Sequence, residues 1–586
     1  MNIPRQFGPR LSAEGVNFRL WAPAARRVDV LLDEPAPMIK RDAWFEYHAP
    51  KAKAGTLYLF RIDGDLEIAD PASQFQPHDV AGPSEVIDQA YAWKSEDWKG
   101  RPWEDAVFLE LHVGTFTPEG TYRAAIAKLE HLANTGITAV ELMPVADFPG
   151  RWNWGYDGVL WFSPDSSYGR PEDLKEFIDT AHSKGLMVFL DVVYNHFGPQ
   201  GNYLGRIAPE FFSFEKTPWG GAVNYEVPEV RQFAIENALY WLSVFRFDGL
   251  RFDAVHAIVT PGSPHILQEL SLAVGNLARE SGRHIHLVLE NDDNRASLLN
   301  PWKDPPCGEY RAQWNDDYHH AWHVLLTGET EGYYKDYPDT AARVVRSLRE
   351  GFSYQGEASN HRKGLARGEP SINLPPAAFV NFLQNHDQIG NRALGDRITT
   401  LVISDAIRAA QCILLLAPSP PLLFMGEEWG ATEPFPFFCD FHGELADAVR
   451  RGRRAEFSEA YADPSIEVPD PLASRTWRSA VLDWGAISRP PFTENLAFVR
   501  SLLRVRSDKI VPLTRLLGAG KAEVSFENGL LSARWRTPNQ VLQLVANVSH
   551  LPMAYSVNEG YGDPIWGGPP ASPLSPWSVH AGIASR

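Results

Sequence analysis

Cysteine is scarce in this sequence. Among 586 residues there are three cysteines, Cys307, Cys412 and Cys439, and no two of them form a CxxC pair. Three cysteines cannot all pair with one another, and a zinc knuckle needs closely spaced Cys or His ligands. The sequence therefore indicates neither a disulfide framework nor a zinc knuckle.

Long apolar runs are also missing. A membrane-spanning helix needs about 20 consecutive apolar residues, and the most apolar stretch, CILLLAPSPPLLFMG, is interrupted by prolines. The first residues, MNIPRQFGPRLSAEG, lack the apolar segment of a signal peptide. We therefore expect a cytoplasmic protein with no membrane partner.

Positive charge is in deficit. The 55 Lys and Arg residues stand against 73 Asp and Glu, which gives a net charge of −18. Nucleic acids and anionic membranes are bound by clustered Lys and Arg, so we expect neither as a partner. A neutral substrate would be indifferent to this charge. Aromatic residues are plentiful, with 19 Trp and 19 Tyr, and exposed aromatic rings would suit the faces of sugars.

The two ends of the chain have the pattern of β domains. Residues 1–95 contain short alternating runs such as VNFRLWAP and TLYLFRID, which predict an N-terminal β-sandwich of immunoglobulin-like, carbohydrate-binding-module-like form. Residues 511–586 contain AEVSF, LLSARWR and QVLQLVANV, which predict a C-terminal antiparallel β domain. Either domain could bind sugar or only pack against the centre.

Between them, residues 96–510 alternate apolar runs with amphipathic helices, such as those predicted over 171–185 and 228–245. Near-continuous apolar runs are typical of parallel strands that are buried on both faces. The predicted strands cover residues 107–113, 139–145, 186–193, 249–255, 286–291, 310–315, 378–385 and 421–426.

Eight such units predict an α/β fold, a (β/α)₈ TIM barrel, with an insertion over 427–490. An open doubly wound sheet is the alternative, but no GxGxxG motif follows the first strand.

Acidic residues stand at the ends of four predicted strands: Asp191, Asp253, Glu290 and Asp387. The carboxyl ends of barrel strands form the active sites of barrel enzymes. Crowded like charges destabilise a fold, so their retention points to chemistry. Paired carboxylates are what glycoside hydrolysis needs, one to attack the anomeric carbon and one to protonate the leaving oxygen. Arg251 shares a strand face with Asp253 and would keep it ionised.

A metal-dependent barrel hydrolase is the competing interpretation, because histidines also stand near strand ends. These are His112, His196, His256 and His386. Such sites typically use a His-x-His pair at the end of the first strand, where this sequence has a single histidine. The pair His284 and His286 opens the fifth strand, at the wrong end of the barrel. We therefore expect no metal and no other cofactor.

The segments DVVYNH, GLRFDAVHA, VLEND and QNHD resemble the four sequence regions of the α-amylase superfamily, glycoside hydrolase family 13. The resemblance covers essentially the whole chain. It implies that Asp253 is the nucleophile, Glu290 the general acid/base and Asp387 the stabiliser of the transition state, with retention of anomeric configuration.

The resemblance also implies which residues contact sugar. Within the superfamily, LDVVYNHFGPQGNYL, QWNDDYHH and NFLQNHDQIGNRA are most similar to enzymes that act on malto-oligosyltrehalose and release trehalose, a neutral substrate. The implied substrate-binding residues are Tyr156, His196, Arg251, His256, Asn315, Asp316, Asp317, His319, His320, His386, Gln388, Asn391 and Arg392, with Trp219 as a further aromatic candidate.

Two other functions stay open at this point. A glucan branching enzyme, which is a transglycosylase, shares the same catalytic trio, and a catalytically inactive glucan-binding protein would share the fold. Some α-amylases use an asparagine equivalent to Asn195 as a calcium ligand. No full set of oxygen donors accompanies Asn195 in this sequence, so we expect no required metal.

Overall fold

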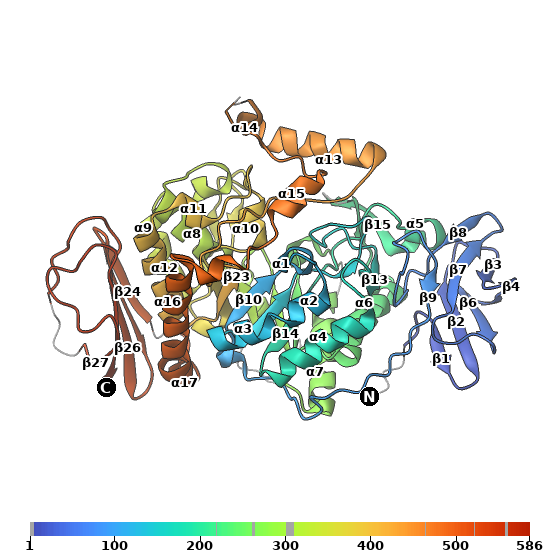
Figure 1. Cartoon of the computed structure of the whole chain (residues 1–586), viewed down its shortest axis with the longest axis horizontal. Helices are drawn as coiled ribbons and strands as arrows, with labels where there is room; N and C mark the ends of the chain where they lie inside the picture. Colours follow the sequence, from blue (N-terminus) through green and yellow to red (C-terminus); the bar gives the residue numbers. More distant parts are fainter. Residues whose placement is uncertain are drawn as a thin grey trace.

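A computed structural model describes residues 5–217, 220–260, 264–299, 310–462, 465–520, 522–556 and 561–586. The N-terminal sheets lie at one end of an elongated molecule, a barrel occupies the centre, and the C-terminal sheet lies at the opposite end (Figure 1). None of the helices in the described ranges is long and apolar enough to cross a membrane.

Eight parallel strands close into a barrel, in which β23 pairs with β10. In order they are β10 (Phe108–Leu111), β11 (Ala139–Leu142), β14 (Met187–Val192), β17 (Gly249–Phe252), β18 (His286–Leu289), β19 (Ala312–Trp314), β22 (Phe379–Phe382) and β23 (Pro421–Phe424). Each strand lies within one of the predicted runs, so the TIM barrel is confirmed and the doubly wound sheet is wrong.

Every residue of these eight strands is buried. One face of the strands fills the barrel with side chains such as Phe108, Phe189 and Trp314, while the other face packs against the surrounding helices. Burial on both faces is the reason why the strands form continuous apolar runs in the sequence.

Helices follow the strands and cover the outside of the barrel (Figure 1). The predicted helices are present as α4 (Pro171–Ser183) and α6 (Pro228–Val244), each with a proline at its first position, where no backbone N–H is needed. The other longer helices are α3 (Leu129–Thr135), α7 (Ile266–Ser281), α8 (Asp316–Thr327), α9 (Thr340–Glu350), α12 (Ser404–Leu416) and α16 (Phe492–Val505).

After β23 the chain makes an excursion with α13 (Gly443–Glu456), α14 (Ser458–Ala462) and α15 (Ser474–Ser479). These helices project from the barrel at the top of Figure 1, within the predicted insertion. The short hairpins β12 (Ala146–Asp147) with β13 (Leu160–Pro164), β15 (Phe212–Thr217) with β16 (Gly220–Val223), and β20 (Glu357–Ala358) with β21 (Ala366–Arg367) are further excursions.

The two ends of the chain form antiparallel sheets, as predicted. At the N-terminal end, one sheet has β1 (Arg10–Ser12), β2 (Gly15–Trp21), β6 (Trp44–Ala49) and β5 (Ile39–Arg41), and the other has β4 (Pro35–Pro37), β3 (Val28–Leu31), β7 (Leu57–Ile62) and β8 (Leu66–Ile68), with β9 (Ser84–Glu85) on β7. The C-terminal sheet has β24 (Ala522–Glu527), β25 (Leu530–Arg536), β26 (Gln540–Asn547), β28 (Val579–Ser585) and β27 (Asp563–Trp566).

Candidate active site

The acidic residues singled out from the sequence meet at the carboxyl end of the barrel. Asp191 lies near the end of β14, Asp253 directly follows β17, and Glu290 directly follows β18. Asp387 lies in the first turn of α10 (His386–Gly390), which comes after β22. This is the end at which barrel enzymes place their catalytic groups.

Arg251 is the centre of the charge network. Its side chain is 2% exposed, and its Nη1 atom donates hydrogen bonds to Asp191 Oδ2 at 2.6 Å and Asp253 Oδ1 at 3.0 Å. Its Nη2 atom lies 3.2 Å from Glu290 Oε2. Burial by itself would lower the pKa of Arg251, but Asp191, Glu290 and Asp253 outweigh burial and raise it well above its usual value. Arg251 is therefore a permanent cation shared by three carboxylates.

Asp253 is held from two sides. Asn195 Nδ2 donates to Asp253 Oδ2 at 2.8 Å and to the Asp253 backbone oxygen at 2.9 Å, while Arg251 binds the other carboxylate oxygen. The next residue, Ala254, has a left-handed backbone with a φ of 41°. This conformation costs a non-glycine residue roughly 1–2 kcal/mol, and here it accompanies a 2.6 Å hydrogen bond from the Ala254 N–H to Glu290 Oε2.

Glu290 has the electrostatic surroundings of a proton donor. Burial raises its pKa well above the usual value, Arg251 opposes this rise, and the nearby Asp253 and Asp316 add to it. A carboxyl group with a raised pKa keeps its proton near neutral pH and can deliver it to a leaving oxygen. Asp253 and Glu290 therefore lie side by side in different environments.

Asp387 and His386 complete this end of the barrel. Asp387 Oδ1 accepts a 2.7 Å hydrogen bond from Asn391 Nδ2, and burial raises the pKa of Asp387. The backbone N–H of His386 donates to Glu110 Oε2 at 2.9 Å, and its Nδ1 lies 2.5 Å from Glu110 Oε1. Burial lowers the pKa of His386, but Glu110 outweighs burial and raises it. Glu110 therefore favours the charged form of this imidazole, which lies beside Asp387.

Tyr156 contacts both Asp191 and His386. Its hydroxyl donates to Asp191 Oδ2 at 2.6 Å, and its ring stacks on His386 with a centroid separation of 5.0 Å. His196 Nε2 lies 2.9 Å from the backbone oxygen of Tyr156. These contacts fix Tyr156, His196 and His386 around the carboxylates at the barrel mouth, where the resemblance had implied that they bind sugar.

The amide of Asn195 is engaged by protein atoms at both ends. Its Nδ2 group serves Asp253, and its Oδ1 atom faces His196 Nδ1. Within the described ranges no group of three or more His, Cys, Asp and Glu side chains is arranged to hold a metal ion. Both ends of the Asn195 amide are therefore occupied by protein atoms.

A cavity of about 170 Å³ opens beside Glu290 and Asp387. Three further predicted residues line it: Asp316, His320 and Gln388. Burial raises the pKa of Asp316 to about 7, and its Oδ1 accepts a 3.2 Å hydrogen bond from Gln388 Nε2. The cavity therefore begins at Glu290 and Asp387 and extends over α8 and α10.

The rest of the wall was not predicted. It comes from the segment after β18 and from the excursion between α8 and β22, and consists of Asp292, Tyr333, Asp336, Tyr337, Ser359, His361, Arg362 and Arg367. Arg362 pairs with Asp292, and also with Asp293 at 2.7 Å. Apart from Asp292, the last residue of VLEND, no motif in the sequence marks these residues. Glu110 was missed as well, although it shares a strand face with His112 and so had a detectable pattern.

Three predicted residues on or before α8 lie beneath this wall. Asn315 Nδ2 donates to the Gly351 oxygen and Asn381 Oδ1, and His319 Nδ1 lies 2.6 Å from the Leu383 oxygen. Asp317 accepts hydrogen bonds from protein donors, including Arg367 Nη1 at 2.9 Å. These hydrogen bonds are to other protein groups, and none of the three residues lines the cavity.

The remaining predicted residues lie around the site. His256 is exposed, and its Nδ1 accepts a 3.3 Å hydrogen bond from the Asp292 N–H. Arg392 forms a two-pronged ion pair with Glu329, at 2.7 and 2.9 Å. Trp219 lies outside the described residues.

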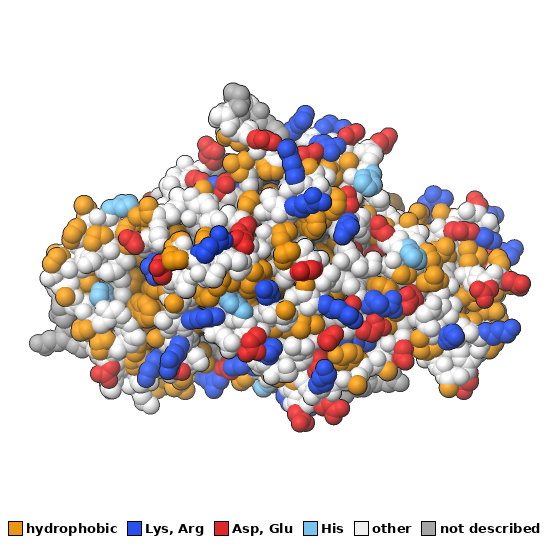
Figure 2. Space-filling view, in the orientation of Figure 1, with side chains coloured by type: hydrophobic (Ala, Val, Ile, Leu, Met, Phe, Trp, Pro, Cys, Tyr) orange, Lys and Arg blue, Asp and Glu red, His pale blue; other side chains and the backbone are white. Residues whose placement is uncertain are grey.

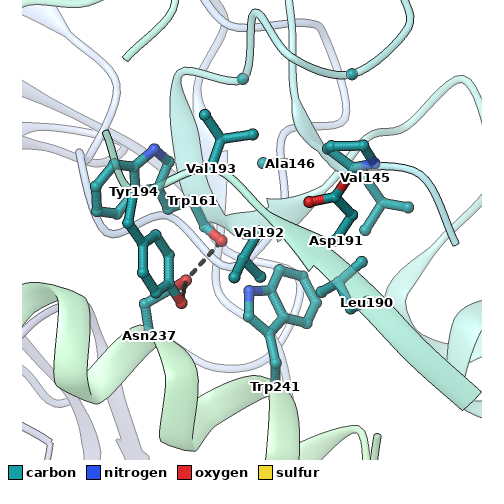
Figure 3. A pocket seen from close by; sticks show the side chains of 13 residues that line it. Val145, Ala146, Trp161, Leu190, Asp191, Val192, Val193, Tyr194, Asn237 and Trp241 are labelled. Carbon is teal, nitrogen blue, oxygen red and sulfur yellow. Dashed lines mark hydrogen bonds between the residues drawn. The ribbon is translucent and has the colours of Figure 1, made fainter. Parts of the chain in front are cut away.

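A second, much smaller cavity of about 20 Å³ lies behind β14, among Trp161, Tyr194 and Trp241 (Figure 3). Asn237 on α6 borders it, where its Oδ1 accepts a 2.7 Å hydrogen bond from the Tyr194 hydroxyl. This volume suits one water molecule and is far too small for a sugar. The cavity at Glu290 and Asp387 is the candidate substrate site, because the acidic side chains at the carboxyl end of the barrel border it.

Comparisons with known proteins agree with this geometry. Residues 89–209 match the alpha amylase catalytic domain family, and residues 6–73 match carbohydrate-binding module 48, the isoamylase N-terminal domain. A malto-oligosyltrehalose trehalohydrolase from Saccharolobus solfataricus is 38% identical over 531 residues, which is 89% of this chain and 89% of that protein. The chain belongs to the malto-oligosyltrehalose trehalohydrolase family.

The trehalohydrolase family assignment extends over the whole structure. The crystal structure of a putative alpha amylase from Salmonella typhimurium superposes on this structure with a TM-score of 0.94 and 43% sequence identity. The alignment covers 99% of this chain and 100% of that chain. A 1,4-alpha-glucan branching enzyme from Corynebacterium jeikeium is 34% identical over 464 residues, and this chain covers 61% of it. Likeness to the trehalohydrolase family is thus both higher and more complete, and the implied α-amylase superfamily membership is confirmed.

Proposed function

We propose that this protein is a retaining glycoside hydrolase that cleaves the α-1,4-glucosidic bond next to the terminal trehalose unit of malto-oligosyltrehalose and releases free trehalose. The observation that carries the chemistry is the pairing of Asp253 and Glu290 around Arg251, with the pKa of Glu290 raised by burial. The trehalohydrolase family membership supports the choice of substrate.

In the first step, a carboxylate oxygen of Asp253 attacks the anomeric carbon of the sugar at the cleavage point. The bond from this carbon to the bridging oxygen breaks, and that oxygen takes the proton of Glu290 as it leaves in trehalose. The products are a glycosyl ester on Asp253, free trehalose and an ionised Glu290. Asp387 stabilises the positive charge that develops on the sugar ring.

In the second step, water attacks the same carbon from the side that trehalose has left. Glu290 takes a proton from this water, and the ester bond to Asp253 breaks. Glu290 is then protonated and Asp253 ionised again. Two displacements at one carbon retain its configuration.

The cavity wall provides groups suited to a neutral sugar. Asp316, His320 and Gln388 reach it from α8 and α10, and sugar hydroxyls both donate to and accept from such side chains. We assign Asp316, His320, Gln388 and Arg392 to the leaving-group side and Tyr156, His196 and His386 to the cleaved sugar. Asn315, Asp317 and His319 support the wall from beneath, and Asn391 orients Asp387.

We divide the chain into residues 1–95, 96–510 and 511–586, with the barrel as the catalytic part. The match of residues 6–73 to carbohydrate-binding module 48 supports the first boundary. The cytoplasmic location stays a prediction.

The test compares matched substrates of four glucose units, maltosyl-trehalose and maltotetraose. We expect trehalose and maltose from maltosyl-trehalose at least about tenfold faster than any cleavage of maltotetraose, a difference of about 1.4 kcal/mol in transition-state binding. Equal rates would reduce the function to a general amylase-type hydrolase. Longer glucans among the products would show a transferase, as in the branching enzyme alternative.

A further inference from the structure

A large cavity lies at the opposite end of the barrel from the catalytic carboxylates. Its volume is about 730 Å³, and its walls include Val107, Thr138 and Gly185, which come just before β10, β11 and β14. Pockets for small-molecule ligands typically measure about 300–1,000 Å³. The amino ends of the strands therefore border a cavity that is large enough for a ligand and separate from the substrate site.

The walls of this cavity come from segments that are far apart in the sequence. They include the end of α3, the end of α16, the π-helical turn Arg506–Ile510 and the beginning of α17 (Val511–Thr514). Helix α16 contacts α3, and α17 contacts the 3₁₀ turn Trp103–Asp105. Packing between helices fixes the shape of the cavity, which is not formed by a single loop.

The lining is strongly basic, although the protein carries a net charge of −18. Its cationic side chains are Arg101, Lys184, Arg500, Arg504, Arg506 and Arg515, and its carboxylates are Asp105 and Asp508. Figure 2 shows blue Lys and Arg side chains over the region where Figure 1 places α3, α16 and α17. The cavity is thus a local positive region on an acidic protein.

The two carboxylates in the wall are too few to neutralise its six cationic side chains. Asp105 is shared between Arg515, at 2.5 Å, and Arg101, at 3.6 Å. Asp508 lies 4.0 Å from Arg504, whose side chain is 86% exposed. Lys184 pairs with Glu130. Arg500 has no ion pair with any described residue, and its buried Nε atom has no hydrogen-bond partner there.

Arg506 is the unusual member of this set. It is 1% exposed, and its Nη atoms donate to the backbone oxygens of Leu415, Ala417 and Ser419. Among the described residues no carboxylate pairs with it, and its Nε atom has no hydrogen-bond partner. Burial lowers the pKa of Arg506 to about 9. The three carbonyl groups at and just after the end of α12 offset part of the cost of burying this cation, and an anion in the cavity would offset more of it.

We propose that this cavity is a second binding site, for a small molecule that carries a phosphate group, held by Arg500 and Arg504 beside the buried Arg506. Guanidinium groups match phosphate oxygens with two parallel hydrogen bonds. A ligand at the amino ends of the strands leaves the catalytic end of the barrel open. The ligand would therefore not compete with the oligosaccharide for the same space.

Isothermal titration calorimetry on the full-length protein tests the proposal with three probes: inorganic phosphate, glucose 6-phosphate and glucose. We expect saturable binding of at least one of the two phosphates and none of glucose at this site. Tighter binding of glucose 6-phosphate would identify a sugar phosphate as the ligand class, and tighter binding of inorganic phosphate would identify the free ion. Non-saturable heats with both phosphates would overturn the proposal.

Variants locate the binding. The double variant Arg500→Gln/Arg504→Gln should weaken phosphate binding at least tenfold. The matched control Arg10→Gln/Arg41→Gln removes two exposed arginines from the N-terminal sheets and should bind as the parent does. If the double variant does not fold, Arg504→Gln alone, at an exposed side chain, should weaken binding at least threefold. Equal affinity in the parent and the cavity variants would place the phosphate elsewhere and refute the site.

Discussion

At the residue scale, one guanidinium group explains how several carboxylates can share a barrel mouth. Arg251 contacts Asp191, Asp253 and Glu290 at 2.6, 3.0 and 3.2 Å. Removal of one member of a buried charge network leaves the others uncompensated and typically costs about 3–5 kcal/mol. Substitution of Arg251 would therefore lower the stability of the fold as well as alter the site. Substitutions that test the chemistry alone have to leave Arg251 in place.

Asp253→Asn tests the nucleophile, because it keeps the shape of the side chain and removes its reactivity. We expect kcat for trehalose release to fall by about 10⁴-fold or more, as for other catalytic nucleophiles and their partners. The measurement is steady-state release of trehalose from maltosyl-trehalose, with circular dichroism to verify the fold. Asp42→Asn, at an exposed turn, is the matched control and should keep full activity. Near-parent activity in Asp253→Asn would refute the mechanism.

The pH dependence tests Glu290. Its pKa is raised by burial and further by Asp253 and Asp316, so activity should fall as pH rises through that pKa and the proton is lost. Asp316→Asn removes one negative neighbour. The pKa of Glu290 should then decrease, and the alkaline limb of kcat/KM should move to lower pH.

The readout for Asp316→Asn is the complete pH profile of kcat/KM, which reports groups of the free enzyme. A merely reduced rate with an unchanged alkaline limb would mean that Asp316 contacts sugar without influencing Glu290. A limb shifted to higher pH would contradict the assignment of Glu290 as the acid. Asp42→Asn should leave the profile as it is.

At the scale of elements, the barrel was predictable because its strands obey a simple physical rule. Strands buried on both faces are mostly apolar, so a charged residue at the end of such a run stands out, as Asp253 does after β17 and Glu290 after β18. The cavity wall was not predictable by that rule. Arg362 and Arg367 come from an excursion between α8 and β22, and no local pattern indicates where such a loop folds back.

Close packing between strands leaves no room for a side chain at Gly249 in β17. A Cβ atom there would lie 2.2 Å from Phe189 Cε1 and 2.5 Å from the backbone oxygen of His286. Because Phe189 is fully buried, Gly249→Ala should destabilise the protein by about 1–3 kcal/mol, seen as a lower urea midpoint. Gly452→Ala on α13, where nothing lies within 4 Å, is the control and should be neutral or slightly stabilising. Equal midpoints for the two variants would contradict this account.

At the scale of the whole molecule, the N-terminal sheets are joined to the barrel through α6. Phe7 meets Phe233 edge to face at 5.0 Å, and Trp21 meets Phe211 at 5.5 Å. Glu236 accepts hydrogen bonds from the backbone N–H groups of Gln6 and Phe7. The first described segment is thus anchored in the same aromatic core as the helix, and we infer that sheets and barrel unfold together.

Phe233→Ala tests this coupling, because Phe233 also contacts Trp161, Phe162, Phe197 and Phe211. Truncation of a buried Phe costs about 3–5 kcal/mol of unfolding free energy. If the N-terminal sheets and the barrel unfold together, calorimetry should show one transition with a lower midpoint temperature. Phe214→Ala removes a fully exposed ring and should leave the midpoint temperature of the transition unchanged. If Phe233→Ala instead splits off an early transition while the barrel unfolds at its original temperature, the N-terminal sheets form an independent unit, and the barrel does not depend on them for its stability.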